Sequence, residues 1–219
     1  MAGENQHPKE SQRHIVRAFW KHLARLRLVH RLALDFFVWL DECFVDSRTA
    51  NPRQGWSVRG KRAISRHVFS RGRRLSVMMA LKHDGILDFD VVPGAYNSYD
   101  LWTWFVERLF GRLNAFPGPN SIVIWDGCNT HRFKPLLKHL RKMGVVVLIL
   151  PGYSPWLNPV ELMFNTLKAV LRKMRPASDD LMMMAIVQII RKYAVVDYRP
   201  ALRRAGYGHM IDDLGRVAS

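Results

Sequence analysis

The sequence contains little cysteine, no histidine or cysteine metal-ligand pairs, and no long apolar run. Only Cys43 and Cys128 are present in 219 residues, which excludes a disulfide-stapled scaffold or a cysteine-rich zinc module and fits a reducing, intracellular setting. None of the nine histidines forms a His-x-x-x-His pair, so a structural zinc site is not expected. The apolar runs are too short for a membrane-spanning helix, and the N-terminus lacks the apolar core of a secretory signal.

Acidic residues are also few beside the basic ones. Lysine and arginine number 34 against 18 acidic residues, which gives a formal net charge of +16. Hydrophobic residues make up 48% of the chain and exclude intrinsic disorder, because disordered chains combine high charge with few hydrophobic residues. A folded chain this basic indicates a polyanionic partner, either nucleic acid or an anionic membrane surface. Because an apolar span and a signal are both missing, we expect nucleic acid and no membrane.

The first part of the chain predicts one helix followed by strands. Apolar residues recur at helical spacing from Ser11 to about Leu32 with cations between them, which indicates a basic amphipathic helix. Such a helix either packs one face on the body and leaves its cations in water, or reads DNA. The expected segments that follow are a buried strand at 34–40, a loop or hairpin at 46–62, and two or three strands within 63–92, with Arg74–Lys82 as an inner strand.

The second part alternates helices with short strands. Its expected order is a helix at 99–114, a strand at 122–125, a helix at 132–143 and a strand at 145–150. Two more helices follow: one begins at Asn158-Pro159, and the other covers about 178–194. Strand, helix and strand with short connections favour a parallel pair. The fold class is therefore α/β, a mixed sheet covered by helices. We expect a polar tail and basic helix over 1–33, one domain over 34–210 and a C-terminal tail over 211–219.

Three carboxylates stand at the ends of predicted elements. Asp41 ends the first strong strand, Asp126 ends the 122–125 strand, and Glu161 lies in the first turn of a helix. In open α/β sheets, ligands usually bind beyond the carboxyl ends of strands. Burying an acid there is costly unless it is paired or binds a cation. Carboxylates without His or Cys nearby in the sequence suit hard ions such as Mg²⁺ or Mn²⁺.

Each of these acids also has a purely structural interpretation. Asp41 can mark the point where a strand emerges into solvent, and Asp126 can be a turn former. Glu161 fits a capping box, in which Asn158 is the N-cap and Pro159 the first helical residue. The roles do not exclude one another, because a carboxylate at a helix N-terminus can also face a site.

The segment between the second and third acids carries a specific motif. Between Asp126 and Glu161 lie 34 residues, which end in the run Leu150-Pro151-Gly152-Tyr153-Ser154-Pro155-Trp156-Leu157-Asn158-Pro159-Val160. This run resembles the DDE transposases of the mariner-like superfamily, whose hallmark is a Tyr-Ser-Pro loop, then Leu-Asn-Pro and the third catalytic acid. The 34-residue gap is one of that superfamily's usual spacings.

Other segments agree with this resemblance, which covers about residues 35–210. The matching segments are Trp39-Leu40-Asp41-Glu42 (first strand and first catalytic Asp), Gly55-Trp56-Ser57-Val58-Arg59-Gly60-Lys61-Arg62, Phe116-Pro117-Gly118-Pro119, His131 and Ala205-Gly206-Tyr207. Three positions depart from the family's usual residues. Gly127 stands in place of Asn, Gly152 in place of a second Pro, and Trp156 in place of an acidic or small polar residue.

The resemblance implies a ribonuclease H-like fold, a mixed five-stranded sheet flanked by helices, and a metal-dependent endonuclease. Asp41, Asp126 and Glu161 would jointly bind two Mg²⁺ or Mn²⁺ ions about 3.5–4 Å apart at the scissile phosphate of double-stranded DNA. The implied reaction is phosphodiester hydrolysis followed by transesterification, which cleaves and joins DNA in transposition without a covalent enzyme intermediate.

Further residues are candidates for contact with DNA or the metal site. The candidate phosphate track consists of Arg53, Arg59, Lys61, Arg62, Arg71, Arg73 and Arg74, and its alternative is a solvated positive face. Trp56 either stacks on a base or pins a hairpin. The secondary candidates are Glu42 (a partner of the metal ligands or a surface acid), His131 (a phosphate contact, a loop-ordering residue or a plain helix-start residue) and Asn158.

Cys43 and Cys128 each follow a proposed metal-binding Asp by two residues. If the two strands are parallel neighbours, the thiols lie near one another at the mouth of the site, or their spacing is a coincidence. A separation of the two Cα atoms above about 7 Å excludes a bridge.

Three functions stay open at this point. The first is a transposase catalytic domain, truncated or retained by a host, because only about 33 residues precede the first strand where full-length relatives carry helix-turn-helix modules. The second is a catalytically inactive DNA-binding protein derived from a transposase. The third, a ribonuclease H acting on RNA–DNA hybrids, is disfavoured by the Tyr-Ser-Pro motif. The implied partners are transposon ends, target DNA and a second copy of the chain (a homodimer), in the nucleus of a eukaryote or otherwise in the cytoplasm or nucleoid.

Overall fold

The structure, a computed structural model, describes residues 10–30, 33–51, 56–62, 64, 73–128 and 132–212. Within these ranges five strands form one sheet in the order β3-β2-β1-β4-β5. The strands are β1 (Phe37–Val45), β2 (Leu75–Lys82), β3 (Gly85–Pro93), β4 (Ile122–Trp125) and β5 (Val146–Ile149). The pairs β1–β2 and β2–β3 are antiparallel, whereas β1–β4 and β4–β5 are parallel. The predicted mixed sheet and the predicted parallel pair are confirmed.

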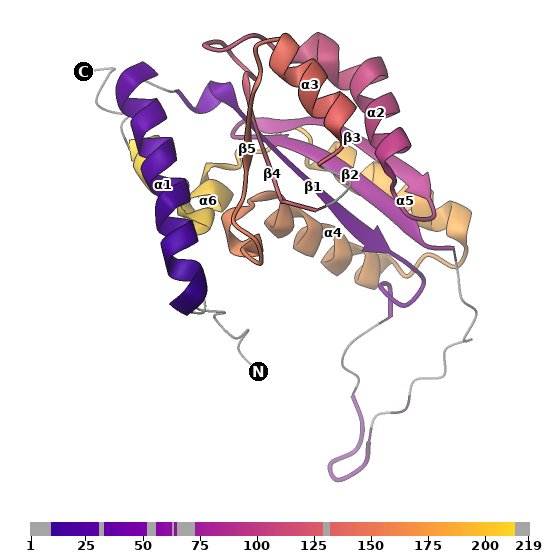
Figure 1. The fold of residues 1–219 in the computed structure, drawn as a ribbon. Coiled ribbons are helices and arrows are strands. Elements are labelled where there is room, and N and C mark those ends of the chain that lie inside the picture. Colours follow the sequence, from indigo (N-terminus) through magenta and orange to yellow (C-terminus); the bar gives the residue numbers. More distant parts are fainter. Residues whose placement is uncertain are drawn as a thin grey trace.

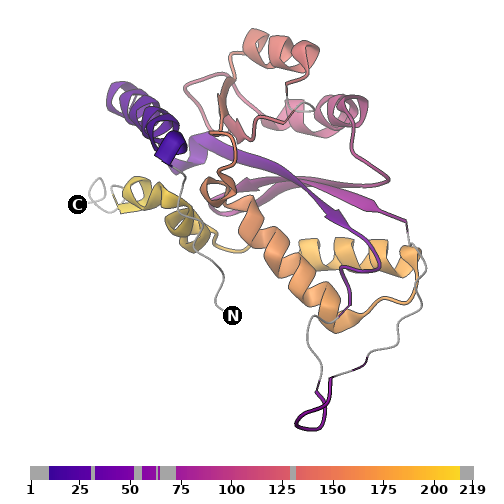
Figure 2. The same ribbon diagram turned by 60° about the horizontal axis from the view of Figure 1, so that its bottom comes forward.

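Helices cover both faces of the sheet (Figures 1 and 2). On one face lie α2 (Ser98–Trp104) and α3 (Lys134–Lys142), and on the other lie α4 (Val160–Met174) and α5 (Asp179–Lys192). β2 is buried from Leu75 to Leu81, as expected of an inner strand covered on both sides. The chain is thus an α/β domain of three layers, with the sheet in the middle.

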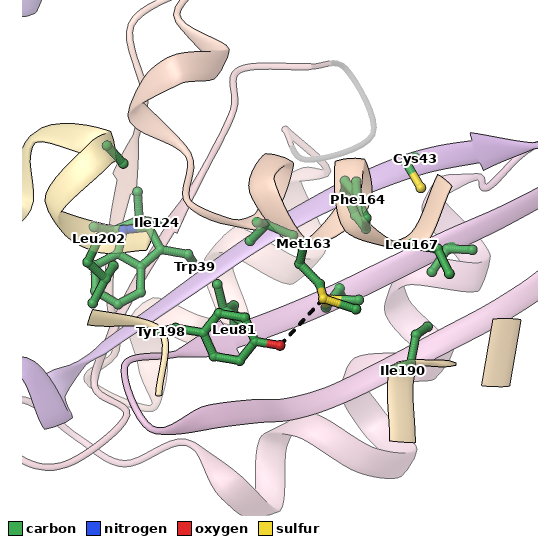
Figure 3. Close-up of a cluster of buried hydrophobic side chains, with 14 of the residues drawn as sticks. Trp39, Cys43, Leu81, Ile124, Met163, Phe164, Leu167, Ile190, Tyr198 and Leu202 are labelled. Atoms are coloured by element: carbon green, nitrogen blue, oxygen red, sulfur yellow. Dashed lines mark hydrogen bonds between the residues drawn. The ribbon is translucent and has the colours of Figure 1, made fainter. Parts of the chain in front are cut away.

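Side chains along β1 alternate between two cores. Phe37 and Trp39 face α4 and α5, whereas Val38 and Leu40 face α2 and α3. Figure 3 shows the first core, in which Trp39, Cys43, Leu81 and Ile124 of the sheet meet Met163, Phe164 and Leu167 of α4 and Ile190 of α5. Asp41 follows Trp39 by two residues and therefore points to the α4 side of the sheet.

The N-terminal helix α1 (Glu10–His30) packs against the C-terminal segment, which consists of α6 (Arg199–Leu202), a π-helical turn (Arg203–Tyr207) and α7 (Gly208–Asp212). Leu23 is buried, and the ring of Trp20 meets Tyr207 edge-on with centroids 5.1 Å apart. Tyr207 in turn meets Trp39 of β1 at 5.2 Å. The predicted basic helix is confirmed, with its apolar face packed and cations such as Arg17 and Lys21 exposed. In the described ranges, no helix is both long and apolar enough for a membrane span.

The first strand differs from its prediction at both ends. Leu34–Phe36 form a 3₁₀ turn, and β1 continues to Val45 because residues 41–45 pair with β2. Asp41 therefore lies inside β1, and the prediction that it ends the strand is wrong. Its parallel pairing with β4 nevertheless ends at Trp39 opposite Ile124, so Asp41 lies beyond the end of that ladder.

The helix predicted at 99–114 consists of three pieces. α2 ends at Trp104, and a π-helical turn over 105–109 and a 3₁₀ turn over 110–112 follow. A π-helical turn contains more residues than an α-helical one, and it rotates the buried face. Trp104, three residues after the buried Leu101, already lies on the core face at the end of α2, whereas Val106, which the predicted apolar stripe includes, is 50% exposed.

Candidate active site

Asp41 and Asp126 lie beyond the paired region of neighbouring parallel strands. Trp39 of β1 is opposite Ile124 of β4, and the two acids each follow that pair by two residues. Asp41 is 8% exposed, and its Oδ1 accepts the N–H of Glu42 at 2.9 Å. Oδ1 of Asp126 accepts the N–H of Cys128 at 3.2 Å, which is the turn-forming role expected of an aspartate at this place. The turn therefore sets the direction in which the chain leaves the sheet at Asp126.

Asn158 joins the Tyr-Ser-Pro segment to β1. Its Nδ2 donates to the carbonyl of Leu40 at 3.0 Å, and its Oδ1 accepts the N–H of Val160 at 3.2 Å. The side chain is 2% exposed, so water does not compete for either bond. Leu40 immediately precedes Asp41, and Val160 immediately precedes Glu161. One amide thus connects the strand and the helix that carry two of the three acids.

The capping box predicted around Glu161 is wrong. α4 begins at Val160, and its N-cap is Pro159, which has no side chain that could accept a hydrogen bond. Asn158 lies one position too early for the motif because its amide bridges β1 and the first helical residue. The Glu161 carboxylate makes no capping bond and lines a pocket instead.

A pocket of about 520 Å³ opens at this edge of the sheet, and all three acids line it. The rest of its wall consists of Gly127, Cys128 and Arg132 after β4, the segment 150–155, and Asn158. Tyr153, whose backbone has a φ of +54°, is 89% exposed. Acids from β1, from the end of β4 and from α4 therefore share one cavity, although they are far apart in the sequence.

Electrostatic effects also place these acids near one another. Burial raises the pKa of Glu161, Lys168 lowers it in part, and the charge of Asp126 raises it further. Burial likewise raises the pKa of the Cys43 thiol to about 12; Lys168 opposes this change, whereas Asp41 and Glu161 reinforce it. Negative charges gathered in a half-buried pocket favour the binding of a cation.

The donor set fits a hard divalent ion by its chemistry, since it offers carboxylate oxygens. In the part of the chain that the structure describes, however, no group of three or more His, Cys, Asp or Glu side chains is arranged to hold a metal ion. Asp41, Asp126 and Glu161, which line one cavity, are the residues that would hold such an ion.

The secondary candidates have different positions. Glu42 lies on the opposite face of β1 from Asp41, and it is half-buried and not a plain surface acid. There it adds to the effect of burial, which raises the pKa of Tyr96. His131 lies outside the described residues. Cys43 is buried and Cys128 half-buried, and both are free thiols, so no bridge joins them.

The predicted phosphate track does not line the pocket where the structure describes it. Trp56 is fully exposed, and Arg59, Lys61 and Arg62 are exposed in a turn that lies apart from the rest of the domain (Figure 1). Arg74 stacks its guanidinium on Phe44, 3.2 Å from the ring centroid, at the far end of β1. Arg53 and Arg71 lie outside the described residues.

Two basic residues near the acids were not predicted from the sequence as part of the site. Arg132 lines the pocket, and Lys168 of α4 is close enough to lower the pKa of Glu161. For Lys168 a signal was present, because seven residues after Glu161 is two helical turns and hence the same helix face. For Arg132 the sequence offered only its closeness to Asp126.

A mixed five-stranded sheet with three carboxylates at one pocket defines a class of protein. The sequence profile of the DDE superfamily endonucleases matches residues 37–182, a region that includes all three acids. The chain therefore belongs to this family. Its fold is the ribonuclease H-like fold of the mariner transposase catalytic domain.

Solved structures of the Mos1 transposase are similar to the chain. The Mos1 paired-end complex with the left transposon end has a TM-score of 0.73 at 17% identity, covering 94% of this chain and 62% of that one. The Mos1 strand transfer complex gives 0.72 at 16%, with 95% and 63% covered. The catalytic domain of Mos1 mariner transposase gives 0.53 at 14%, with 92% and 97% covered. The chain thus spans 62% of the length of the Mos1 chain in the paired-end complex. No curated protein sequence matches it.

Proposed function

We propose that the chain is the catalytic domain of a transposase that cleaves and joins phosphodiester bonds of double-stranded DNA with two divalent metal ions. One observation carries the proposal: Asp41, Asp126 and Glu161, from three separate elements, share a single pocket in a chain of the DDE endonuclease family. The net charge of +16 supports a polyanionic substrate.

The three acids are the residues that would hold Mg²⁺ or Mn²⁺. The chemistry that such ions supply when bound is a lowered pKa for water or a DNA 3′-hydroxyl and stabilisation of the leaving oxygen. Mos1 complexes with Mn and with Mg are among the similar structures. The residues around the acids would keep them in place. Asn158 holds α4 against β1, and the turn at Asp126 determines the direction in which the chain leaves β4.

The partners belong to the same proposal. The similar Mos1 structures are a paired-end complex with a transposon end and a strand transfer complex. We therefore propose transposon ends and target DNA as substrates, held by two copies of the chain. Light scattering of the protein with a short duplex should give the mass of a complex with two protein chains.

Nicking of supercoiled plasmid tests the activity. With Mn²⁺, the purified protein should convert the plasmid to the open circle, and the Asp126→Asn variant should not. Asn keeps the oxygen that accepts the Cys128 N–H, so circular dichroism should show the same fold for both proteins. Equal nicking by both, or nicking by neither, contradicts the proposal. Faster cutting of an RNA–DNA hybrid than of duplex DNA would favour a ribonuclease H instead.

A second candidate function is DNA binding without cutting. The observation that favours it is Gly127, directly after the second acid, where the family usually has Asn. In that case both proteins of the nicking experiment bind duplex DNA with equal affinity and neither cuts it.

A further inference from the structure

One cation, Arg132, stands in the wall of the acidic pocket. It lies two residues before α3 begins, and its backbone N–H donates to the carbonyl of Cys128 at 3.2 Å. This bond closes the loop that leads from Asp126 to α3. The side chain lines the same cavity as the three acids and is exposed to the solvent in it.

The guanidinium of Arg132 lies against Gly127. A Cβ at position 127 would be 3.0 Å from Nη2 and 3.7 Å from Cζ of Arg132, and 3.4 Å from Cγ2 of Ile149. A side chain at position 127 therefore crowds the guanidinium, which has to shift by a few tenths of an ångström. The family usually has Asn at this position. The Cβ of such an Asn would be close to the Arg132 guanidinium, so the change to Gly affects where the arginine can lie.

The Arg132 side chain makes no polar contact with the residues around it that the structure describes. Although it shares a pocket with three acids, its guanidinium has no hydrogen bond or ion pair with any residue in the described ranges. Its fork of N–H donors is therefore available to a ligand, and this fork matches the oxygens of a phosphate. α3, which has no side-chain cap, adds the positive end of its dipole at the same wall.

We propose that Arg132 binds a non-bridging phosphate oxygen of the DNA strand in the pocket, and that Gly127 leaves the guanidinium uncrowded in the position from which it makes this contact. The inference rests on the proposed function, because it takes DNA as the ligand. Arg132 makes and breaks no bond; it would hold the phosphate next to the acids. A charge-assisted, bidentate contact of this kind is among the strongest polar contacts that a side chain forms.

Binding of a fluorescent duplex tests the contact, with Ca²⁺ present as a hard cation that takes oxygen ligands. Arg132→Gln should weaken binding about tenfold, which corresponds to ~1.4 kcal/mol. It should also lower the slope of log affinity against log salt by about 0.9, the value of one lost phosphate contact. Arg132→Lys keeps the charge but loses the fork, so its affinity should be intermediate. The matched control is Arg141→Gln, an exposed cation of α3 outside the pocket, which should change neither quantity.

Gly127→Asn tests the link between the two residues without removing a charge. It should weaken binding in the wild-type background and have no further effect in the Arg132→Gln background. Additive losses overturn the role of Gly127, and an Arg132→Gln variant that behaves like Arg141→Gln overturns the phosphate contact. If the wild type nicks plasmid, and the Arg132→Gln variant binds duplex DNA with the same affinity as the wild type, only this inference fails. A wild type that does not bind duplex DNA overturns both this inference and the proposed function.

Discussion

Asn158 is a buried residue whose two hydrogen bonds determine how β1 and α4 meet. Replacing it with Ala leaves the carbonyl of Leu40 and the N–H of Val160 without these partners in a site that is 2% exposed. We expect Asn158→Ala to lower the free energy of unfolding by about 1–3 kcal/mol. Urea unfolding followed by tryptophan fluorescence measures this loss. Nicking should fall as well, because Asp41 and Glu161 lose their common support.

Asn165 provides the matched control, since it is an exposed asparagine on the same helix. Asn165→Ala should leave stability unchanged or raise it by a few tenths of a kcal/mol, about the difference in helix propensity. Losses of equal size in the two variants would show that the Asn158 bonds contribute nothing beyond helix propensity.

The residues of the site were predictable only where their signal is local. The acids could be found because Asp41 and Asp126 directly follow apolar runs of the sequence, Glu161 lies in the first turn of a helix, and the Tyr-Ser-Pro motif is continuous in the chain. The partner of Asn158 could not, because Leu40 is 118 positions away. Arg132 could not either, since one arginine among 34 basic residues stands out only when the fold places it in a pocket.

At the scale of elements, Gly206 determines how α1 docks on the domain. Its φ is +96°, and a Cβ would be 2.9 Å from Cζ2 of Trp20. We expect Gly206→Ala to lower the free energy of unfolding by about 1–3 kcal/mol, through backbone strain and the clash with Trp20. The unfolding midpoint in urea gives the stability, and the tryptophan emission, compared with that of a Trp20→Phe variant to isolate Trp20 among the seven tryptophans, should report a more exposed indole.

Gly208, two residues further on, is the control for this substitution. Its φ is −53°, and an added Cβ would have its nearest neighbour at 3.8 Å. Gly208→Ala should therefore be neutral or stabilise the fold by about 0.4–1 kcal/mol through the unfolded state. If both alanines destabilise the chain alike, the close approach of Gly206 to Trp20 is not the cause.

The turn after β1 should make stability depend on pH. Burial raises the pKa of Asp46, but hydrogen bonds from Arg48 and Thr49 outweigh this effect and lower the pKa below its usual value. The carboxylate therefore contributes stability that is present above its unfolded-state pKa and is lost as pH falls through the lower folded-state pKa. Wild type should be more stable than Asp46→Asn at pH 7, and the difference should close at acidic pH. Urea unfolding of both proteins at several pH values measures it, and a difference that is independent of pH contradicts the assignment.

The elements themselves were largely predictable, and their ends were not. Apolar runs located β1, β2, β4 and β5 because buried strands need continuous hydrophobic residues, whereas the half-exposed β3 was placed only within the range 63–92. The end of β1 was misplaced because residues 41–45 are in a strand through their pairing with β2, which no local pattern shows. Val106 was misplaced because the buried face of α2 runs through Leu101, Trp104 and Phe105, and the mixed apolar residues of this segment do not show which face packs on the sheet.

At the scale of the whole molecule, the net charge of +16 is spread over several surfaces. The pocket contains the acids and Arg132, whereas the turn with Arg59, Lys61 and Arg62 follows the C-terminal end of β1 and extends away from the domain (Figure 2). If this turn contacts phosphates away from the pocket, its cations contribute to affinity and not to cutting. The triple replacement of these three residues by Gln should weaken DNA binding and lower the salt slope by up to about 2.7, at 0.9 per phosphate contact. Because all three side chains are exposed, the free energy of unfolding should stay the same.

The control for the turn removes the same charge elsewhere. Lys138, Arg141 and Lys142 are exposed on α3, on the opposite face of the sheet from α4 and α5. Their triple replacement by Gln lowers the net charge equally, so it accounts for any general effect of charge on the attraction of DNA. A larger change in salt slope for the turn than for α3 identifies the turn as a DNA-contacting surface. Equal changes mean that the turn is a solvated positive face, and that the affinity of this chain for DNA comes from its overall charge and its pocket.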